Sequence, residues 1–281
     1  MPTFATPEPV AVSIELSVGD IRVVASDRTD TIVEVRPSDE SRELDVRDAE
    51  ATRVELTPSG LIIKAPRPRG LGLLGKPGSV DVIIELPAGS SLQGESSVAA
   101  FHGTGRLGEC KIKTTAGKVE LDQTGSLDLH TGAGSVEVGR VDGDADVTTG
   151  TGRIRLGEID GSAVIKNSNG ATRIDAVTGD LRMNASNGDL TVGRADGNVT
   201  GKSANGEIRI GRVSRGTVEI KTSNGEIEIG VAGGTAARLD LFTSFGNVRN
   251  HMDSADSPEP TDSVVEVSAR TSYGDIVIRR A

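Results

Sequence analysis

The stretch that decides the fold runs over residues 126–215 and consists of five consecutive units of 18 residues. They read SLDLHTGAGSVEVGRVDG, DADVTTGTGRIRLGEIDG, SAVIKNSNGATRIDAVTG, DLRMNASNGDLTVGRADG and NVTGKSANGEIRIGRVSR. A sixth unit follows at 216–234 with one extra residue. Constant unit length at this period is typical of a solenoid, in which each unit buries its apolar face against its neighbours.

Apolar and polar residues alternate in two arms of each unit. In the second unit, Ala145 and Val147 precede the turn glycine Gly152, and Ile154 and Leu156 follow it. A spacing of two places these side chains on one face of a strand, whereas a helix would need a period of 3.6. The sequence therefore predicts an all-β fold, a parallel β-solenoid or β-helix with coils of about 18 residues and an irregular N-terminal cap region.

Turn residues recur at fixed places in the units. Asparagine precedes glycine at Asn169-Gly170, Asn187-Gly188, Asn205-Gly206 and Asn224-Gly225, where a positive φ costs little. Further glycine columns leave open whether each coil is a flattened two-sheet form or a three-sided one. The stacked asparagines also suggest a side-chain amide ladder, either as a recognition stripe or, as we favour, simply through the demands of the turn.

The same alternation of apolar and polar residues, followed outward from the repeats, divides the chain into segments. Residues 1–9 are expected to form a flexible N-terminus and residues 10–281 a single β-solenoid domain. Within it we expect irregular N-terminal coils at 10–95 with an insertion at 67–79, regular coils at 96–250, a loop at 251–263 and a C-terminal coil at 264–281.

Composition excludes several classes of partner and site. The net charge of −10 and the 2% aromatic content disfavour nucleic acid and anionic membrane surfaces. GxGxxG at 103–108 precedes a strand rather than the helix that a dinucleotide site needs, and His102, His130 and His251 fall in different coils. We therefore predict no catalytic residue, no cofactor and no metal. The start MPTFATPEPVAVSIEL lacks the features of a secretory signal, so we expect a cytoplasmic protein.

The insertion at 67–79 is the most singular stretch, because it is basic, rich in glycine and apolar at its centre. Such a segment could dock a partner, or it could be a merely flexible insertion. The candidate partner contacts are Arg67, Arg69, Leu71, Leu73, Leu74 and Lys76.

The repeats carry T-x-x-G-D-I-x-[VI]-type motifs at both ends (LSVGDIRV and TSYGDIVI) and SNG or ANG turns in the middle. They resemble the DUF4097 β-strand-repeat family, whose domain is labelled "putative adhesin", over residues 10–280. The TPEPV start looks like that of short, cytoplasmic, actinobacterial-type members. The family implies a parallel β-helix-like fold and has no established catalytic residues. A looser similarity is to bactofilins, cytoplasmic β-helices that polymerise end to end.

Three functions follow as hypotheses. We favour a non-catalytic interaction scaffold that presents a flat sheet face, or the 67–79 insertion, to a protein partner. The alternative is a self-assembling, bactofilin-like structural protein that stacks through an open apolar edge at 263–280. The least favoured is a polysaccharide-acting enzyme, which would need two carboxylates facing each other across a groove.

Overall fold

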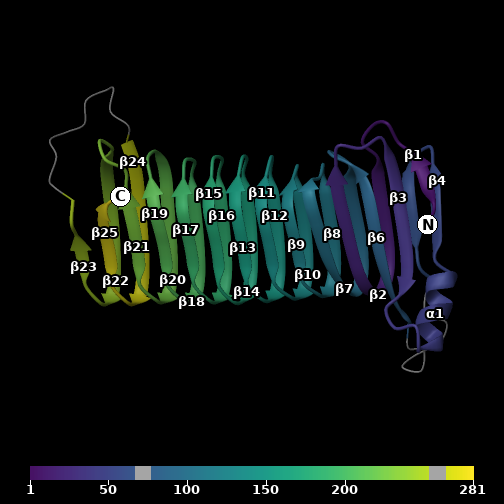
Figure 1. Ribbon diagram of the computed structural model, residues 1–281. Helices are drawn as coiled ribbons and strands as arrows, with labels where there is room; N and C mark the ends of the chain where they lie inside the picture. Colours follow the sequence, from purple (N-terminus) through teal and green to yellow (C-terminus); the bar gives the residue numbers. More distant parts are fainter. Residues whose placement is uncertain (67–76, 253–263) are drawn as a thin grey trace. The chain divides into compact units, whose positions relative to one another are not determined.

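The computed structural model describes residues 1–66, 77–252 and 264–281. The chain is nearly all β and forms a parallel β-solenoid, as the repeat predicts, with one short helix among the described residues. It has two compact units, Met1–Asp142 and Gly143–Ala281. Figure 1 gives the element labels used below.

The second unit holds the regular coils, each made of two strands. The first strands of successive coils are β12 (Ala145–Thr151), β14 (Ala163–Asn169), β16 (Leu181–Asn187), β18 (Val199–Asn205) and β20 (Gly216–Asn224). The second strands are β13 (Ile154–Ile159), β15 (Thr172–Val177), β17 (Leu190–Ala195), β19 (Ile208–Val213) and β21 (Ile227–Val231). Equivalent strands pair in parallel, so that Ala163 lies beside Leu181 and Thr172 beside Leu190.

The core of this unit consists of the predicted inward columns. Ile154 and Leu156 are fully buried, and so is Ile159, which breaks the alternation by one residue. The strand therefore bends at Gly157 and Glu158 while it stays in the ladder. Each coil thus has two strands, as in the flattened two-sheet form. The second strand is bent, which gives the coil part of the outline of the three-sided form.

The predicted amide ladder is confirmed at the first corner of the coils. The amide of Asn187 donates to Asn169, that of Asn205 to Asn187 and that of Asn224 to Asn205, each at 2.9 Å. The adjoining glycines are needed because the coils stack so closely. At Gly170, where φ is +134°, a Cβ would lie 2.1 Å from the carbonyl oxygen of Gly152.

The order of the last coils differs from the order in the sequence. β24 (Val264–Tyr273) and β25 (Ile276–Arg280) pair with β20 and β21 on one side. On their other side they pair with β22 (Ala236–Phe245) and β23 (Val248–Asn250). The C-terminal coil is therefore inserted between two earlier ones. The open edge at 263–280 that self-assembly would have favoured is therefore not present among the described residues, and β22 and β23 form the edge instead (Figure 1).

The first unit begins with coils that run through both arms as single long strands, β2 (Ala11–Ser26) and β7 (Ser91–Arg106), which pair in parallel. They are followed by β8 (Cys110–Ala116), β9 (Val119–Thr124), β10 (Leu127–Ala133) and β11 (Val136–Val141). On its other side β2 pairs with β5 (Gly60–Lys64) along its first arm and with β6 (Ser79–Pro87) along its second.

Antiparallel strands cover this beginning of the first unit. β3 (Asp30–Pro37) pairs with β6, and β4 (Arg53–Thr57) forms a hairpin with β5 around Ser59 and Gly60. Thr3–Ala5, part of the segment expected to be flexible, forms β1 against β3, because the buried hydroxyl of Thr6 reaches Thr31 at 2.7 Å.

A single helix, α1 (Glu43–Glu50), lies beside β3 and β6 and is held by its own carboxylates. Asp45 and Asp48 are buried and accept hydrogen bonds from the backbone N–H groups of Ser79 and Gly78, at 3.0 and 2.8 Å. These contacts fix the start of β6, since charge-assisted bonds to buried amides are among the stronger ones in proteins.

Candidate functional site: a hollow on a sheet face

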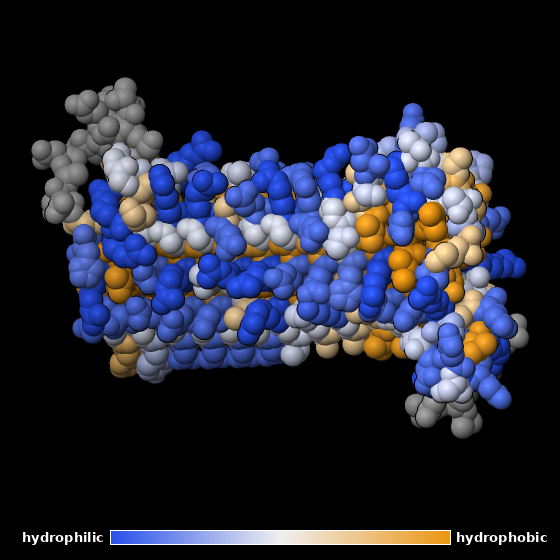
Figure 2. All heavy atoms as spheres, viewed as in Figure 1, coloured by the Kyte–Doolittle hydropathy of each residue, from blue (hydrophilic) through white to orange (hydrophobic). Residues whose placement is uncertain are grey.

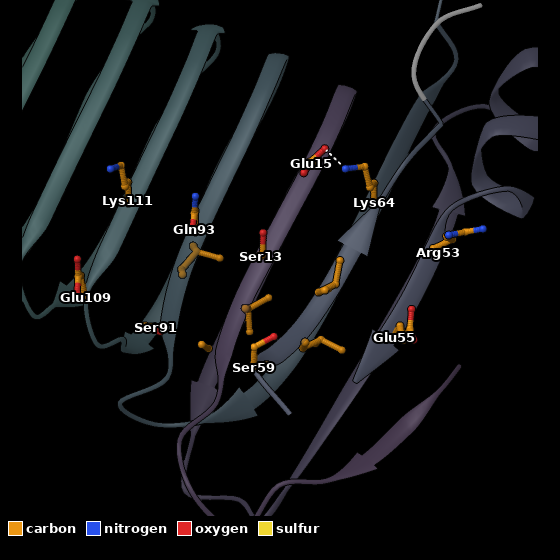
Figure 3. Close-up of a pocket in the computed structure, with 16 residues that line it drawn as sticks. Ser13, Glu15, Arg53, Glu55, Ser59, Lys64, Ser91, Gln93, Glu109 and Lys111 are labelled. Carbon is orange, nitrogen blue, oxygen red and sulfur yellow. Dashed lines mark ion pairs between the residues drawn. The ribbon is translucent and has the colours of Figure 1, made fainter. Parts of the chain in front are cut away.

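The candidate site lies on the outer face of one sheet in the first unit, with strand order β4–β5–β2–β7–β8. Two adjoining hollows, of about 580 and 310 Å³, lie on this face. Both are lined by strands that come from distant parts of the sequence (Figure 3). Pockets on solenoid proteins are expected on such faces, because the interior is filled by side chains.

Strand alternation decides which side chains face the hollows. Val12, Ile14 and Leu16 of β2 are buried, so Ser13, Glu15 and Ser17 point outward. The same alternation turns Ile62 and Lys64 of β5, Gln93 and Glu95 of β7, and Lys111 and Lys113 of β8 outward.

The larger hollow has a weakly polar centre and a charged border. Ser13, Ser91 and Gln93 line it together with Ile62, an aliphatic side chain that is 37% exposed. Arg53 and Glu55 of β4 stand on one side, and Glu109 and Lys111, at the start of β8, on the other (Figure 3). The surface thus offers hydroxyl and amide groups, one apolar contact and charges of both signs.

An ion pair crosses the hollow between its two central strands. Glu15 Oε2 and Lys64 Nζ lie 2.6 Å apart, and both side chains are 40% exposed (Figure 3). An exposed pair of this kind adds little to stability. Both side chains thus lie at the surface of the hollow.

The smaller hollow continues the larger one along β2, since Glu15 lines both. Its lining is rich in hydroxyl groups: Ser17, Ser96, Ser97, Thr114 and Thr115. The β2 residues that line the two hollows run from Ala11 to Ser17. At about 3.3 Å per residue they make a surface about 20 Å long.

The partner contacts predicted from the sequence, Arg67, Arg69, Leu71, Leu73, Leu74 and Lys76, lie outside the described residues. Their nearest described neighbour in this sheet is Ala65, which lines the smaller hollow and donates its N–H to the carbonyl of Glu15 at 2.9 Å. Sequence reasoning missed the hollow itself, because Ser13, Ile62 and Gln93 become neighbours only through strand pairing.

The two carboxylates at the border of the larger hollow are too far apart for a glycosidase pair, whereas Glu15 and Glu95 are register partners on neighbouring strands and both line the smaller hollow. Glu55 and Glu109 stand on opposite sides of the larger hollow, with β5, β2 and β7 between β4 and β8. Four strand spacings of about 4.8 Å put them about 19 Å apart. Glycosidase carboxylates are about 5 to 9.5 Å apart. Within residues 1–66, 77–252 and 264–281, no group of three or more His, Cys, Asp or Glu side chains could hold a metal ion.

No helix in the described part of the chain is long and apolar enough to cross a membrane. The outward surface of the second unit is mainly hydrophilic, with rows of like side chains running across its strands (Figure 2). Two outward columns carry basic residues but are interrupted, since Thr191 separates Arg173 from Arg209 and Asn184 separates Lys166 from Lys202.

The fold and the site together define a parallel β-solenoid whose first unit carries a hollowed outer sheet face. The family comparison places the chain more narrowly. The pattern of the family described as Toastrack DUF4097 matches residues 11–279, so the chain belongs to this family. None of the curated proteins compared with it matches.

Solved structures with a similar chain course include a "putative adhesin" from Bacteroides fragilis. It is 12% identical, the match covers 99% of this chain and 95% of that one, and the TM-score is 0.35. A "putative cell adhesion protein" from Clostridium sporogenes is 10% identical, with 100% and 98% covered and a TM-score of 0.26. A "putative adhesin" from Parabacteroides merdae is 11% identical, with 98% and 94% covered and a TM-score of 0.32.

Proposed function

We propose that this chain is a non-catalytic protein-binding module and that its partner docks into the hollowed face of β4, β5, β2, β7 and β8. The observation that carries the proposal is the hollow, where two adjoining depressions follow a single strand over Ala11–Ser17. An extended peptide of about six or seven residues has this length. Surfaces that bind a ligand in a groove combine apolar contacts with a few placed polar groups, as Ile62 and Gln93 do here.

The partner is read through side chains rather than by strand addition. β2 lies between β5 and β7 and pairs with both, so its backbone groups are already used. A bound segment would instead meet the hydroxyls of Ser13 and Ser91, the amide of Gln93 and the charges of Glu15 and Lys64. These groups favour a polar segment that carries charges of both signs and one aliphatic residue for Ile62.

Site-specific photo-crosslinking in cells of the source organism tests this function. A benzophenone amino acid at position 93 lies in the hollow, whereas the same group at position 182, an exposed outward residue of β16, does not. We expect a defined protein adduct from position 93 and none of the same mass from position 182. Identical adducts from both positions, or none from position 93, would contradict the proposal.

A matched pair of substitutions sharpens the test. Ile62→Lys places a charge in the larger hollow. Val98→Lys places the same charge on β7, at a position that lines neither hollow. Both side chains are exposed aliphatics, 37% and 49%, so neither change should impair folding. We expect Ile62→Lys to lower the adduct yield about tenfold, as the loss of one central apolar contact does, and Val98→Lys to leave it unchanged. The cytoplasmic location and the actinobacterial type remain predictions.

A further inference from the structure

The edge strand of the second unit is β22, which is long and pairs with a neighbouring strand on only one of its two sides within the described residues. Among the described residues, β22 pairs with β24 alone. It is ten residues long, whereas β1 and β4, the edges in the first unit, have three and five residues. Natural proteins usually keep exposed edge strands short, because a long one invites pairing with another chain.

The apolar interior is open at this edge. Leu239 and Leu241 occupy the inward columns beside Val267 and Ala269, yet they are half-buried, whereas Val267 and Ala269 are fully buried. Phe242 and Phe245 are 55% and 65% exposed on the same strand. In a regular coil the next strand would cover Leu239 and Leu241.

The free backbone groups of β22 can be assigned from the ladder. Leu239 lies in the same column as Leu181, whose N–H bonds to the carbonyl of Asn198 in the next coil. In a parallel ladder alternate residues bond to alternate sides. The N–H and C=O groups of Leu239 and of the other inward residues from 237 to 241 therefore point to the free side, and those of Arg238 and Asp240 bond to β24.

We propose that β22 pairs antiparallel with β22 of a second copy of this chain, about a two-fold axis at Leu239. This register faces Arg238 with the partner's Asp240, and Asp240 with the partner's Arg238. Both are outward residues at non-hydrogen-bonded positions, where facing side chains lie closest, and the inward pairs between them exchange the backbone hydrogen bonds, about six over the interface from 237 to 241. Inside, Leu239 meets the partner's Leu239 and Ala237 meets the partner's Leu241.

Charge selects this register over its neighbours. Inward side chains stay opposite inward side chains only when the register changes by two residues at a time. A shift one way places Asp240 opposite the partner's Asp240, and a shift the other way places Arg238 opposite the partner's Arg238. Like charges directly opposite are destabilising, and opposite charges are favourable. Glu266 lies 3.6 Å from Arg238 and Arg270 lies 2.8 Å from Asp240, so the paired charges would extend an alternating row.

The two-fold pairing closes the assembly at two copies, since it uses the same edge of both. A filament would instead need β22 to pair with a different edge, and the edges in the first unit are the short strands β1 and β4. This differs from the end-to-end polymer considered from the sequence. It is also independent of the hollow, so the proposed partner binding does not depend on it.

Charge exchange at β22 tests the proposal on the full chain by light scattering and sedimentation over a concentration series. We expect the wild type to reach twice the 29.1 kDa mass of the chain. Arg238→Asp and Asp240→Arg should each weaken the dimer at least about tenfold, because each sets two like-charge pairs against one another. Their intramolecular ion pairs are exposed, so both variants should fold. Arg173→Asp, which reverses an exposed charge on the inner strand β15, is the control.

Mixing the Arg238→Asp and Asp240→Arg variants gives the decisive result. In an equimolar mixture the two single variants face each other with opposite charges at both positions, so the mass should return to that of a dimer, and the double variant should dimerise alone. A wild type that stays monomeric overturns the proposal, and so does a dimer that both single variants leave intact. Growth beyond two copies also overturns it.

Discussion

At the scale of single residues, Cys110 shows what the narrow interior does to a polar group. Its thiol is fully buried in the first inward column of β8, beside Leu92 and Leu127. Burial raises the pKa of this thiol from 9.0 to about 11, although a hydrogen bond with Thr124 acts in the opposite direction. The cysteine therefore behaves as a small core residue rather than as a reactive thiol.

The raised pKa predicts a loss of stability in alkali. Because the folded pKa lies above the unfolded one, the contribution of Cys110 is fully present below about pH 9 and disappears as the pH rises through about 11. The shift corresponds to about 2–3 kcal/mol. Urea unfolding of the wild type and of Cys110→Ala between pH 8 and pH 11 should show the steeper decline in the wild type. Parallel curves would contradict the assignment.

The amide ladder gives a second residue-scale prediction. Asn187 donates to Asn169 and accepts from Asn205, so Asn187→Ala removes two hydrogen bonds. The side chains are exposed and water replaces the lost partners, so we expect a loss of about 0.5–1.5 kcal/mol in unfolding free energy. Ser186→Ala, on the same strand, is the control and should change it by less than about 0.5 kcal/mol. Equal effects of the two changes would show that the ladder is only a by-product of the turn.

At the scale of elements, the attachment of α1 depends on two buried carboxylates. Asp48→Ala would leave the N–H of Gly78 without its partner. An unsatisfied buried donor costs about 1–3 kcal/mol. Thermal unfolding should show this loss for Asp48→Ala and almost none for Glu43→Ala, an exposed acidic residue of the same helix. A small effect at Asp48 would mean that water reaches Gly78.

Sequence reasoning succeeds for elements whose pattern is local. The period of two gives every regular strand from β12 to β21, and Ser59-Gly60 gives the β4–β5 hairpin. It fails on the order of the last coils, because TSFGNVRN and TSYGDIVI fit the same columns equally well. Phe245 stands beside Tyr273 and Val248 beside Ile276. Nothing in either segment says which of them meets β20.

The candidate site shows the same limit. Ser13, Ile62 and Gln93 are ordinary outward residues in their own strands. They line one hollow only because β5 and β7 flank β2, and that contact joins segments far apart in the chain. The 67–79 insertion stood out by composition, and its candidate contact residues lie outside the described part of the chain.

At the scale of the whole molecule, a repeat of constant length makes the number of coils adjustable. Deleting residues 181–198 removes one coil and lets Ala163 meet Val199 and Asn169 meet Asn205, partners from the same columns. Stability in such proteins is close to a sum over neighbouring repeats. We expect cooperative unfolding and an unchanged strand signal in circular dichroism. Deleting only 190–198 breaks the columns and should abolish cooperative unfolding. If both deletions behave alike, the columns do not determine the stacking.

The inserted coil of β24 and β25 has a consequence for the newborn protein. A stack built in chain order could grow coil by coil as translation proceeds. Here β22 and β23 leave the ribosome before the layer that separates them from β20 and β21 has been synthesised. β24 and β25 are synthesised last and must insert between strands that have already been made. Translation that stops before residue 264 would therefore release a polypeptide that lacks its penultimate layer, and β22, whose residues share the columns of β24, could pair with β20 in its place.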